Sequence, residues 1–216
     1  YDENTGNLRG VNIDGGEVEA SITLADGSKW SHKARGKVVT VGADIFGNRY
    51  YAETIDKYTR EMITLTGQAK VEESISLTVT MNIDGSTSTT NSRIFYKYSK
   101  GEEKEEELPD NILNKADYIN STTGLAYVGL LKGVVDGSVK DKFDINGDGD
   151  TDDLGEINPS GTFSLERDIF GNEWHSLIQT DHIIINQQAK ECLAKMVSHG
   201  MNLDGSLTYT TKGLSY

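Results

Sequence analysis

Asp44-Ile45-Phe46-Gly47-Asn48 recurs 124 residues later as Asp168-Ile169-Phe170-Gly171-Asn172. Each copy is followed, in the same order, by two further blocks that recur at an offset of 120 residues. In the first unit these blocks are Gln68-Ala69-Lys70 and Met81-Asn82-Ile83-Asp84-Gly85-Ser86. In the second they are Gln188-Ala189-Lys190 and Met201-Asn202-Leu203-Asp204-Gly205-Ser206. Three blocks that recur in one order indicate an internal duplication.

The segments around these blocks have the pattern of β-strands. Residues 17–24 and 74–81 alternate polar and apolar side chains, so one face of each segment points inward. Residues 37–41 form a β-branched run, and Asp26-Gly27 supplies a hairpin turn. We expect further strands over 50–55 and 61–66 in the first unit.

The second unit is expected to repeat this order, with two strands over 175–185. Residues 188–199 are ambiguous, because Leu193, Met196 and Val197 have helical spacing. The equivalent segment of the first unit, 71–80, has strand character. The duplication therefore favours a strand over 188–199, with a helix as the alternative.

The predicted fold class is all-β, mainly antiparallel, with duplicated units that resemble a β-sandwich or barrel. We expect a first β unit over 1–98 and a second over 162–216. Residues 99–161 interrupt the pattern with the charge run 102–107, a short helix expected from Pro109 to about residue 118, and a glycine-broken apolar stretch. This part is interpreted as a loop-rich insertion.

Composition narrows the class of partner. The chain has 216 residues and a net charge of −13, which disfavours nucleic acid and anionic membrane surfaces. It has no apolar run near the roughly 18 residues of a membrane helix, so no membrane insertion is expected. Its one cysteine excludes an intrachain disulfide. The first residue is Tyr1 rather than Met, which indicates a piece of a longer protein.

The segment 144–153 has the residue types of a calcium loop. Carboxylate and amide oxygens alternate around a glycine-enabled turn, and Ca²⁺ prefers six to eight such oxygens. The spacing departs from an EF-hand, because position 12 is glycine and the acidic residue comes one place later. The sequence predicts a structural calcium site between strands, with the ligands Asp144, Asn146, Asp148, Asp150, Asp152 and Glu156.

The sequence contains no recognised catalytic motif. A nucleophile elbow, a P-loop and a dinucleotide-binding fingerprint are all missing. Cys192 and His199 could form a nucleophilic pair only through the fold, because seven residues separate them on a predicted strand. We therefore expect a protein that is not an enzyme.

The repeated blocks resemble the outer domain of the bacterial flagellar hook protein. That family has an Ala-Lys-containing stretch before an Asn-Leu-Asp turn, and a strand that runs into an Asp-x-x-Gly-Asn-like turn. Residues 68–70 with 82–84, 188–190 with 202–204, and the turns at 44–48 and 168–172 carry the likeness. The resemblance implies a structural subunit that is exported and polymerised, and it implies no catalytic residue.

Two functions follow as expectations. The first is a structural domain of an extracellular bacterial assembly at the cell surface, which associates with copies of itself or with other subunits of an appendage. The alternative is a calcium-stabilised binding module of a secreted or cell-surface protein, with carbohydrate as a candidate ligand. The repetition, the acidity, the single cysteine and the lack of a catalytic motif motivate the first hypothesis.

Overall fold

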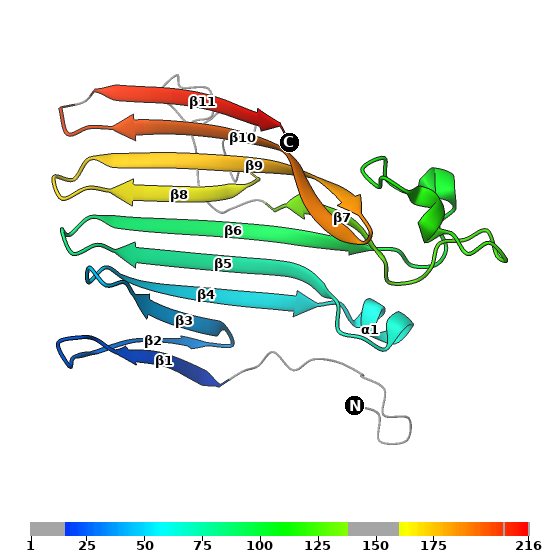
Figure 1. The fold of residues 1–216 in the computed structure, drawn as a ribbon, viewed down its shortest axis with the longest axis horizontal. Coiled ribbons are helices and arrows are strands. Elements are labelled where there is room, and N and C mark those ends of the chain that lie inside the picture. The colour runs from blue at the N-terminus through cyan, green and yellow to red at the C-terminus, as the bar shows by residue number, and fades with distance from the viewer. Residues whose placement is uncertain (1–15, 138–159, 205, 216) are drawn as a thin grey trace.

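Strands make up most of the regular structure in the computed structural model, which describes residues 16–137, 160–204 and 206–215 (Figure 1). The all-β, mainly antiparallel class is confirmed. The strands are β1 Glu17–Thr23, β2 Lys29–Arg35, β3 Val38–Ala43, β4 Arg49–Tyr58, β5 Val71–Met81, β6 Thr87–Tyr98, β7 Leu131–Asp136, β8 Thr162–Arg167, β9 Glu173–Ile185, β10 Gln188–Met201 and β11 Leu207–Ser215. One α-helix, α1 Arg60–Thr66, and two 3₁₀ turns, η1 Glu105–Glu107 and η2 Lys115–Tyr118, complete the elements of the described residues.

The strands form one broad antiparallel sheet in the order β11-β10-β9-β8-β6-β5-β4-β3 (Figure 1). One side of β6 pairs with β5, and its other side pairs with two different strands. Its first half pairs with β8, from Thr87 opposite Arg167 to Asn91 opposite Phe163, and its second half pairs with β7. Strands from all three predicted segments of the chain therefore belong to one sheet. The sheet is open, and the sandwich or barrel expected for each unit is not what these strands build.

Polar pairs on the faces of the sheet link neighbouring strands. Glu73 is 7% exposed and accepts hydrogen bonds from Lys57 (2.8 Å) and Arg93 (2.5 Å). The hydroxyls of Thr90 and Ser164 lie 3.0 Å apart across the junction between β6 and β8. Cross-strand hydrogen bonds and opposite charges of this kind stabilise neighbouring strands.

Strands β1 and β2 form a separate hairpin beside β3, as the Asp26-Gly27 turn predicted (Figure 1). The Trp30 indole donates a hydrogen bond to the backbone oxygen of Tyr50 at 3.3 Å. The His32 ring stacks on the Tyr51 ring with a centroid distance of 3.8 Å. These contacts hold the hairpin against β4 without backbone pairing to the large sheet in the described residues.

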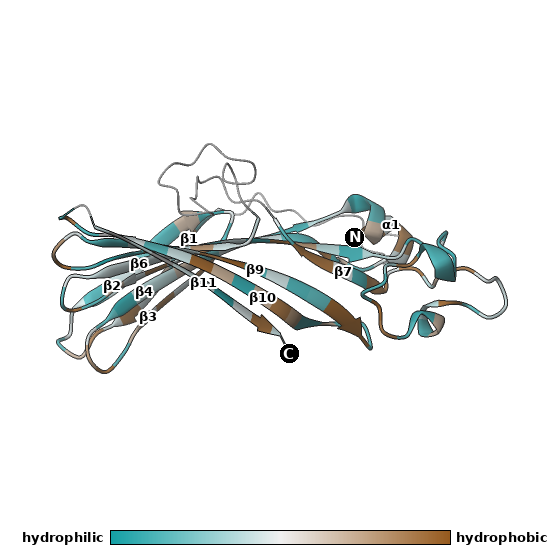
Figure 2. Cartoon of the chain, turned by 90° about the horizontal axis from the view of Figure 1, so that it is seen from above, coloured by the Kyte–Doolittle hydropathy of each residue, from teal (hydrophilic) through white to brown (hydrophobic). Residues whose placement is uncertain are grey.

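Apolar packing is concentrated in two small clusters. One joins the 99–136 segment to the sheet and contains Leu108, Ile112, Tyr118, Ala126, Val134 and Ile184. The other lies where β8, β9 and β10 meet and contains Phe163, Leu177 and Val197. Figure 2 shows the hydropathy of the chain along the twisted sheet. The segment interpreted as a loop-rich insertion thus supplies most of the larger apolar cluster.

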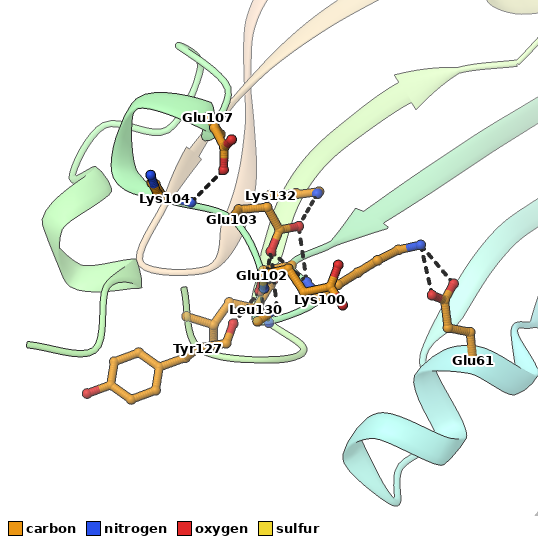
Figure 3. A network of polar contacts seen from close by, with 11 residues as sticks. Glu61, Lys100, Glu102, Glu103, Lys104, Glu107, Tyr127, Leu130 and Lys132 are labelled. Carbon is orange, nitrogen blue, oxygen red and sulfur yellow. Dashed lines mark hydrogen bonds and ion pairs between the residues drawn. The ribbon is translucent and has the colours of Figure 1, made fainter. Parts of the chain in front are cut away.

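A polar network fixes the start of this segment (Figure 3). The Glu103 carboxylate accepts hydrogen bonds from Lys132 Nζ at 2.6 Å and from the backbone N–H groups of Lys100 and Gly101 at 2.9 and 3.1 Å. Lys100 reaches α1 through Glu61, at 2.9 Å. Partial burial acts to raise the pKa of Glu103, but these hydrogen bonds outweigh it and lower the pKa to about 2.

The strand predicted over 61–66 is wrong, because these residues form α1. Thr59 caps the helix by accepting a hydrogen bond from the Glu61 N–H, and Gly67 ends it with φ = 69°. Met62 and Ile63 are adjacent and both buried, which a helix permits and an alternating strand does not.

The two strands predicted over 175–185 are also wrong, because this stretch is the single strand β9. A two-residue turn, Asn186 and Gln187, both with positive φ, leads directly into β10. The strand predicted over 188–199 is confirmed as part of β10. The second unit has four fewer residues between its first and second blocks than the first unit, and α1 lies in that interval.

The short helix predicted from Pro109 to about residue 118 is found only as the 3₁₀ turn η2. The glycine-broken apolar stretch, interpreted as part of a loop-rich insertion, contains the strand β7.

Candidate interaction surface at the turn end of the sheet

The repeated Asp-Ile-Phe-Gly-Asn block forms the same turn twice. Asp44 Oδ1 accepts hydrogen bonds from the N–H groups of Phe46 (2.8 Å) and Asn48 (3.0 Å). Asp168 Oδ1 accepts the equivalent bonds from Phe170 (2.8 Å) and Asn172 (2.9 Å). The carboxylate at the first position thus replaces backbone acceptors and fixes a tight connection between β3 and β4, and between β8 and β9.

The Asn-Ile/Leu-Asp-Gly-Ser block forms a second turn that is locked to the first. Asn48 Oδ1 accepts a hydrogen bond from the Ile83 N–H at 3.0 Å, and Asn172 Oδ1 accepts one from the Leu203 N–H at 3.0 Å. The last residue of the first block therefore holds the second block in space. This explains why the two blocks occur together in both units.

The tips of these turns carry large apolar side chains that are exposed to solvent. We call this set the apolar strip. Its members are Ile45 (93% exposed), Phe46 (71%), Ile83 (75%), Ile169 (54%), Phe170 (71%) and Leu203 (73%). The turns β3–β4, β5–β6, β8–β9 and β10–β11 lie at one end of the sheet, so at ordinary strand spacing the strip extends roughly 30 Å.

Three glycines of these turns, Gly47, Gly85 and Gly171, each lie beside an apolar side chain of the next turn. A methyl group placed on Gly47 would lie 3.3 Å from Ile83 Cδ1. One on Gly85 would lie 3.7 Å from Ile169 Cγ2, and one on Gly171 would lie 3.8 Å from Leu203 Cδ1. The Ile169 side chain of the second unit therefore lies beside the Gly85 turn of the first unit.

Carboxylates flank the strip and stay ionised. Hydrogen bonds from Ser86 and Ser206 lower the pKa of Asp84 and Asp204. Partial desolvation acts to raise the pKa of Asp44 and Asp168, but hydrogen bonds from Asn48, Asn172 and nearby backbone N–H groups outweigh it and lower the pKa. The surface is therefore apolar at its tips and negatively charged beside them.

A groove opens at the first-unit part of the strip, between the β1–β2 hairpin and the turns at 44–48 and 82–86. It encloses about 690 Å³. The Arg49 guanidinium lies 5.6 Å from the centroid of the Trp30 ring in the groove wall. The apolar lining includes Ile22, Leu24, Trp30, Ile45, Phe46 and Ile83. This volume is in the range that proteins use to enclose small ligands or anchoring side chains.

The six predicted calcium ligands, Asp144, Asn146, Asp148, Asp150, Asp152 and Glu156, lie outside the described residues. The calcium site stays a prediction from the sequence. Among residues 16–137, 160–204 and 206–215, no group of three or more His, Cys, Asp or Glu side chains could hold a metal ion.

The cysteine and histidine considered as a nucleophilic pair are far apart. Both lie on β10, and seven residues of strand place them about 23 Å from each other. Cys192 is the extra residue of a β-bulge, and its Sγ donates to the Asp181 backbone oxygen at 3.4 Å. His199 instead stacks on His175 with a centroid distance of 4.9 Å.

Comparisons with family models, curated proteins and solved structures found no match to this chain. Within the described residues, no helix is long and apolar enough to cross a membrane.

The apolar strip was missed at the sequence level, although a signal was present. Both copies place two large apolar residues between the Asp and the Gly of a turn, and both place a third between Asn and Asp. Turn positions usually carry polar residues. A turn that repeats apolar residues at its tip is therefore a sequence signal for an exposed contact surface.

Proposed function

We propose that this chain is a structural, non-enzymatic domain of an extracellular bacterial assembly, and that the apolar strip is the surface through which it docks. The strip is the observation that carries the proposal. At about 200 Å² for a large apolar residue, its exposed fractions amount to roughly 900 Å². Monomeric proteins rarely expose a contiguous apolar patch above roughly 300–600 Å².

The construction of the strip supports a scaffold role. Its side chains stand on tight turns that Asp44, Asn48, Asp168 and Asn172 fix through short hydrogen bonds. Such anchors lose little conformational freedom when a neighbour covers them, which favours a permanent contact. The resemblance of the same blocks to the flagellar hook protein points to the same kind of role.

Localisation provides the test at the level of the cell. Antibodies raised against this domain should label surface appendages on intact cells and detect the protein in the fraction released by shearing. Labelling confined to the cell interior would overturn the proposal.

A second test acts on the surface itself. Phe46→Ser together with Phe170→Ser in the parent protein should remove it from the sheared fraction. Leu113→Ser is the matched control, because Leu113 is 64% exposed and lies outside the strip. If the double variant is incorporated like the control, the strip is not the docking surface.

A further inference from the structure

The boundary between the two units is a strand pair inside the sheet. β6 is the last strand of the first unit and β8 is the first strand of the second. They pair antiparallel, from Thr87 opposite Arg167 to Asn91 opposite Phe163. The molecule therefore contains one complete example of how the last strand of a unit joins the first strand of another unit.

The duplication places the equivalent strands at the two ends of the sheet. β3 and β8 have the same length and are separated by the 124-residue offset of the first block, and β11 starts 120 residues after β6. β3 is the last strand on one side of the large sheet, and β11 is the last on the other side. One copy therefore has a β6-type edge at β11 and a β8-type strand at β3, so a second copy supplies the partner for each.

The two end strands have the composition of strands that pair. Exposed edges are usually protected by charged residues, by proline or by a covering element. β3 has no charged residue and no proline, and residues 207–211 of β11 have none either. Thr40 on β3 and Thr210 on β11 are both exposed. Their equivalents at the boundary between the units, Ser164 and Thr90, have hydroxyls 3.0 Å apart.

The β1–β2 hairpin covers β3. It lies beside β3 on the side away from β4, although it pairs with no strand of the large sheet in the described residues (Figure 1). Side chains attach it to β4, because the His32 ring stacks on Tyr51 and its Nε2 lies 2.6 Å from Glu53 Oε1. The Trp30 indole adds its hydrogen bond to the Tyr50 backbone oxygen. Such a hairpin can leave without breaking a strand pair of the large sheet, and no described strand covers β11 in the same way.

We propose that the hairpin is a removable cap, and that its displacement lets β3 of one copy pair with β11 of another in the β6–β8 register. The inference goes beyond the proposed function, because it uses the edges of the sheet and not the apolar strip. The register places Thr210 opposite Thr40 of the second copy. The contact is heterologous, so each added copy presents a new β11 edge and the sheet grows in one direction.

Release of the cap tests the first part of the proposal. Trp30→Ala with His32→Ala removes contacts to β4 and should convert a monomer into concentration-dependent oligomers, measured by sedimentation velocity up to roughly 1 mM protein. His32→Ala alone, the milder change, should associate at higher concentration than the double variant. Lys33→Ala is the matched control, because Lys33 is 55% exposed and pairs with Glu17 and Glu19 within the hairpin. It should stay monomeric like the wild type.

Two results of this experiment would overturn the proposal. One is that both released variants stay monomeric while far-ultraviolet circular dichroism shows that their sheet is retained. The other is that the wild type associates as strongly as the released variants, because the hairpin would then not act as a cap.

Cysteine cross-linking tests the register. In the released variant with Cys192→Ser, Thr40→Cys together with Thr210→Cys should give a ladder of disulfide-linked oligomers, because directly opposite strand residues lie within disulfide range. Thr40→Cys with Thr208→Cys is the matched control, since diagonal positions lie about 7–8 Å apart and should cross-link poorly. Equal cross-linking of the two pairs, or association without cross-linking of Thr210→Cys, would assign the contact to another surface and overturn the proposal. Surface labelling of cells decides the proposed function separately, so the two failures are distinguishable.

Discussion

Asn48 and Asn172 show how one side chain connects two turns. Asn48 donates to Asp44 Oδ2 at 2.8 Å and accepts from the Ile83 N–H at 3.0 Å. Asn172 makes both bonds in the second unit, at 2.7 and 3.0 Å. The turn chemistry of Asp, Gly and Asn was predictable from the sequence. The bond between turns was not, because its partners lie 35 and 31 residues apart.

Removing this connection should destabilise the protein to a similar extent in either unit. Asn48→Ala and Asn172→Ala should each lower the free energy of unfolding by about 0.5–1.5 kcal/mol, because the hydrogen bond between the two turns is lost. Denaturant titration measures the loss. Asn114→Ala, at a position without a side-chain capping bond, is the control. No loss in either variant would show that the bridge contributes nothing.

Glu103 should make stability depend on pH. Its folded pKa of about 2 lies below the ordinary value of 4.5, so the unfolded state binds the proton more tightly. The stabilisation is complete above about pH 5 and is lost as the pH falls towards 2. Glu103→Gln should lower the free energy of unfolding by about 1–2 kcal/mol at pH 7, allowing for solvent screening. The variant should also lose less stability than the wild type between about pH 5 and pH 2. Thermal melts between pH 2 and 7 measure both effects. If the variant and the wild type show the same pH dependence of stability, Glu103 does not cause it.

At the level of elements, alternation identified β1 and β5, a β-branched run identified β3, and the duplication identified β10. β5 could be recognised from its polar and apolar alternation, and β10 from its likeness to β5. α1 could not be recognised from alternation. Thr59 and Gly67 cap the helix, but the adjacent pair Met62 and Ile63 identifies it only when their burial in the fold is known. Alternation is therefore a weak signal for a short helix that lies in the connection between two strands, as α1 does between β4 and β5.

Gly161 lies directly before β8 and has a backbone conformation that only glycine adopts readily. Its φ of 141° and a β-carbon position only 2.4 Å from the Ile178 backbone oxygen leave no space for a side chain. Gly161→Ala should lower the free energy of unfolding by about 3 kcal/mol through strain and overpacking. Gly16→Ala is the control, because nothing lies within 4 Å of that position. Denaturant unfolding of both variants measures the difference, and equal stabilities would contradict a tight entry into β8.

For the whole molecule, the sequence predicted the class but not the assembly of the sheet. The repeat implied two units, and each could have closed on itself. The pairing of β6 with both β7 and β8 joins them instead. The register from Thr87 opposite Arg167 to Asn91 opposite Phe163 depends on how the 99–161 segment returns the chain, which no local pattern specifies.

The calcium prediction also belongs to the whole molecule, because the predicted ligands come between β7 and β8. If the loop binds Ca²⁺ as its residue pattern predicts, EDTA should lower the melting temperature. Calcium at 100 times its dissociation constant should restore about 2.7 kcal/mol. Asp148→Asn with Asp150→Asn should abolish the response to calcium, with Asp110→Asn as the control. Identical melts with EDTA and calcium would show that no calcium ion stabilises the fold.

The single open sheet has a further consequence for how the protein unfolds locally. From β11 to β3, each strand pairs only with its immediate neighbours, so the stability of the sheet resembles that of a one-dimensional array. Such an array frays from its ends. Amide hydrogen exchange should be fastest in β11, at the edge, and slowest in β9, which holds the buried Leu177 and Ile184. Uniform protection across the strands would instead indicate one all-or-none unit.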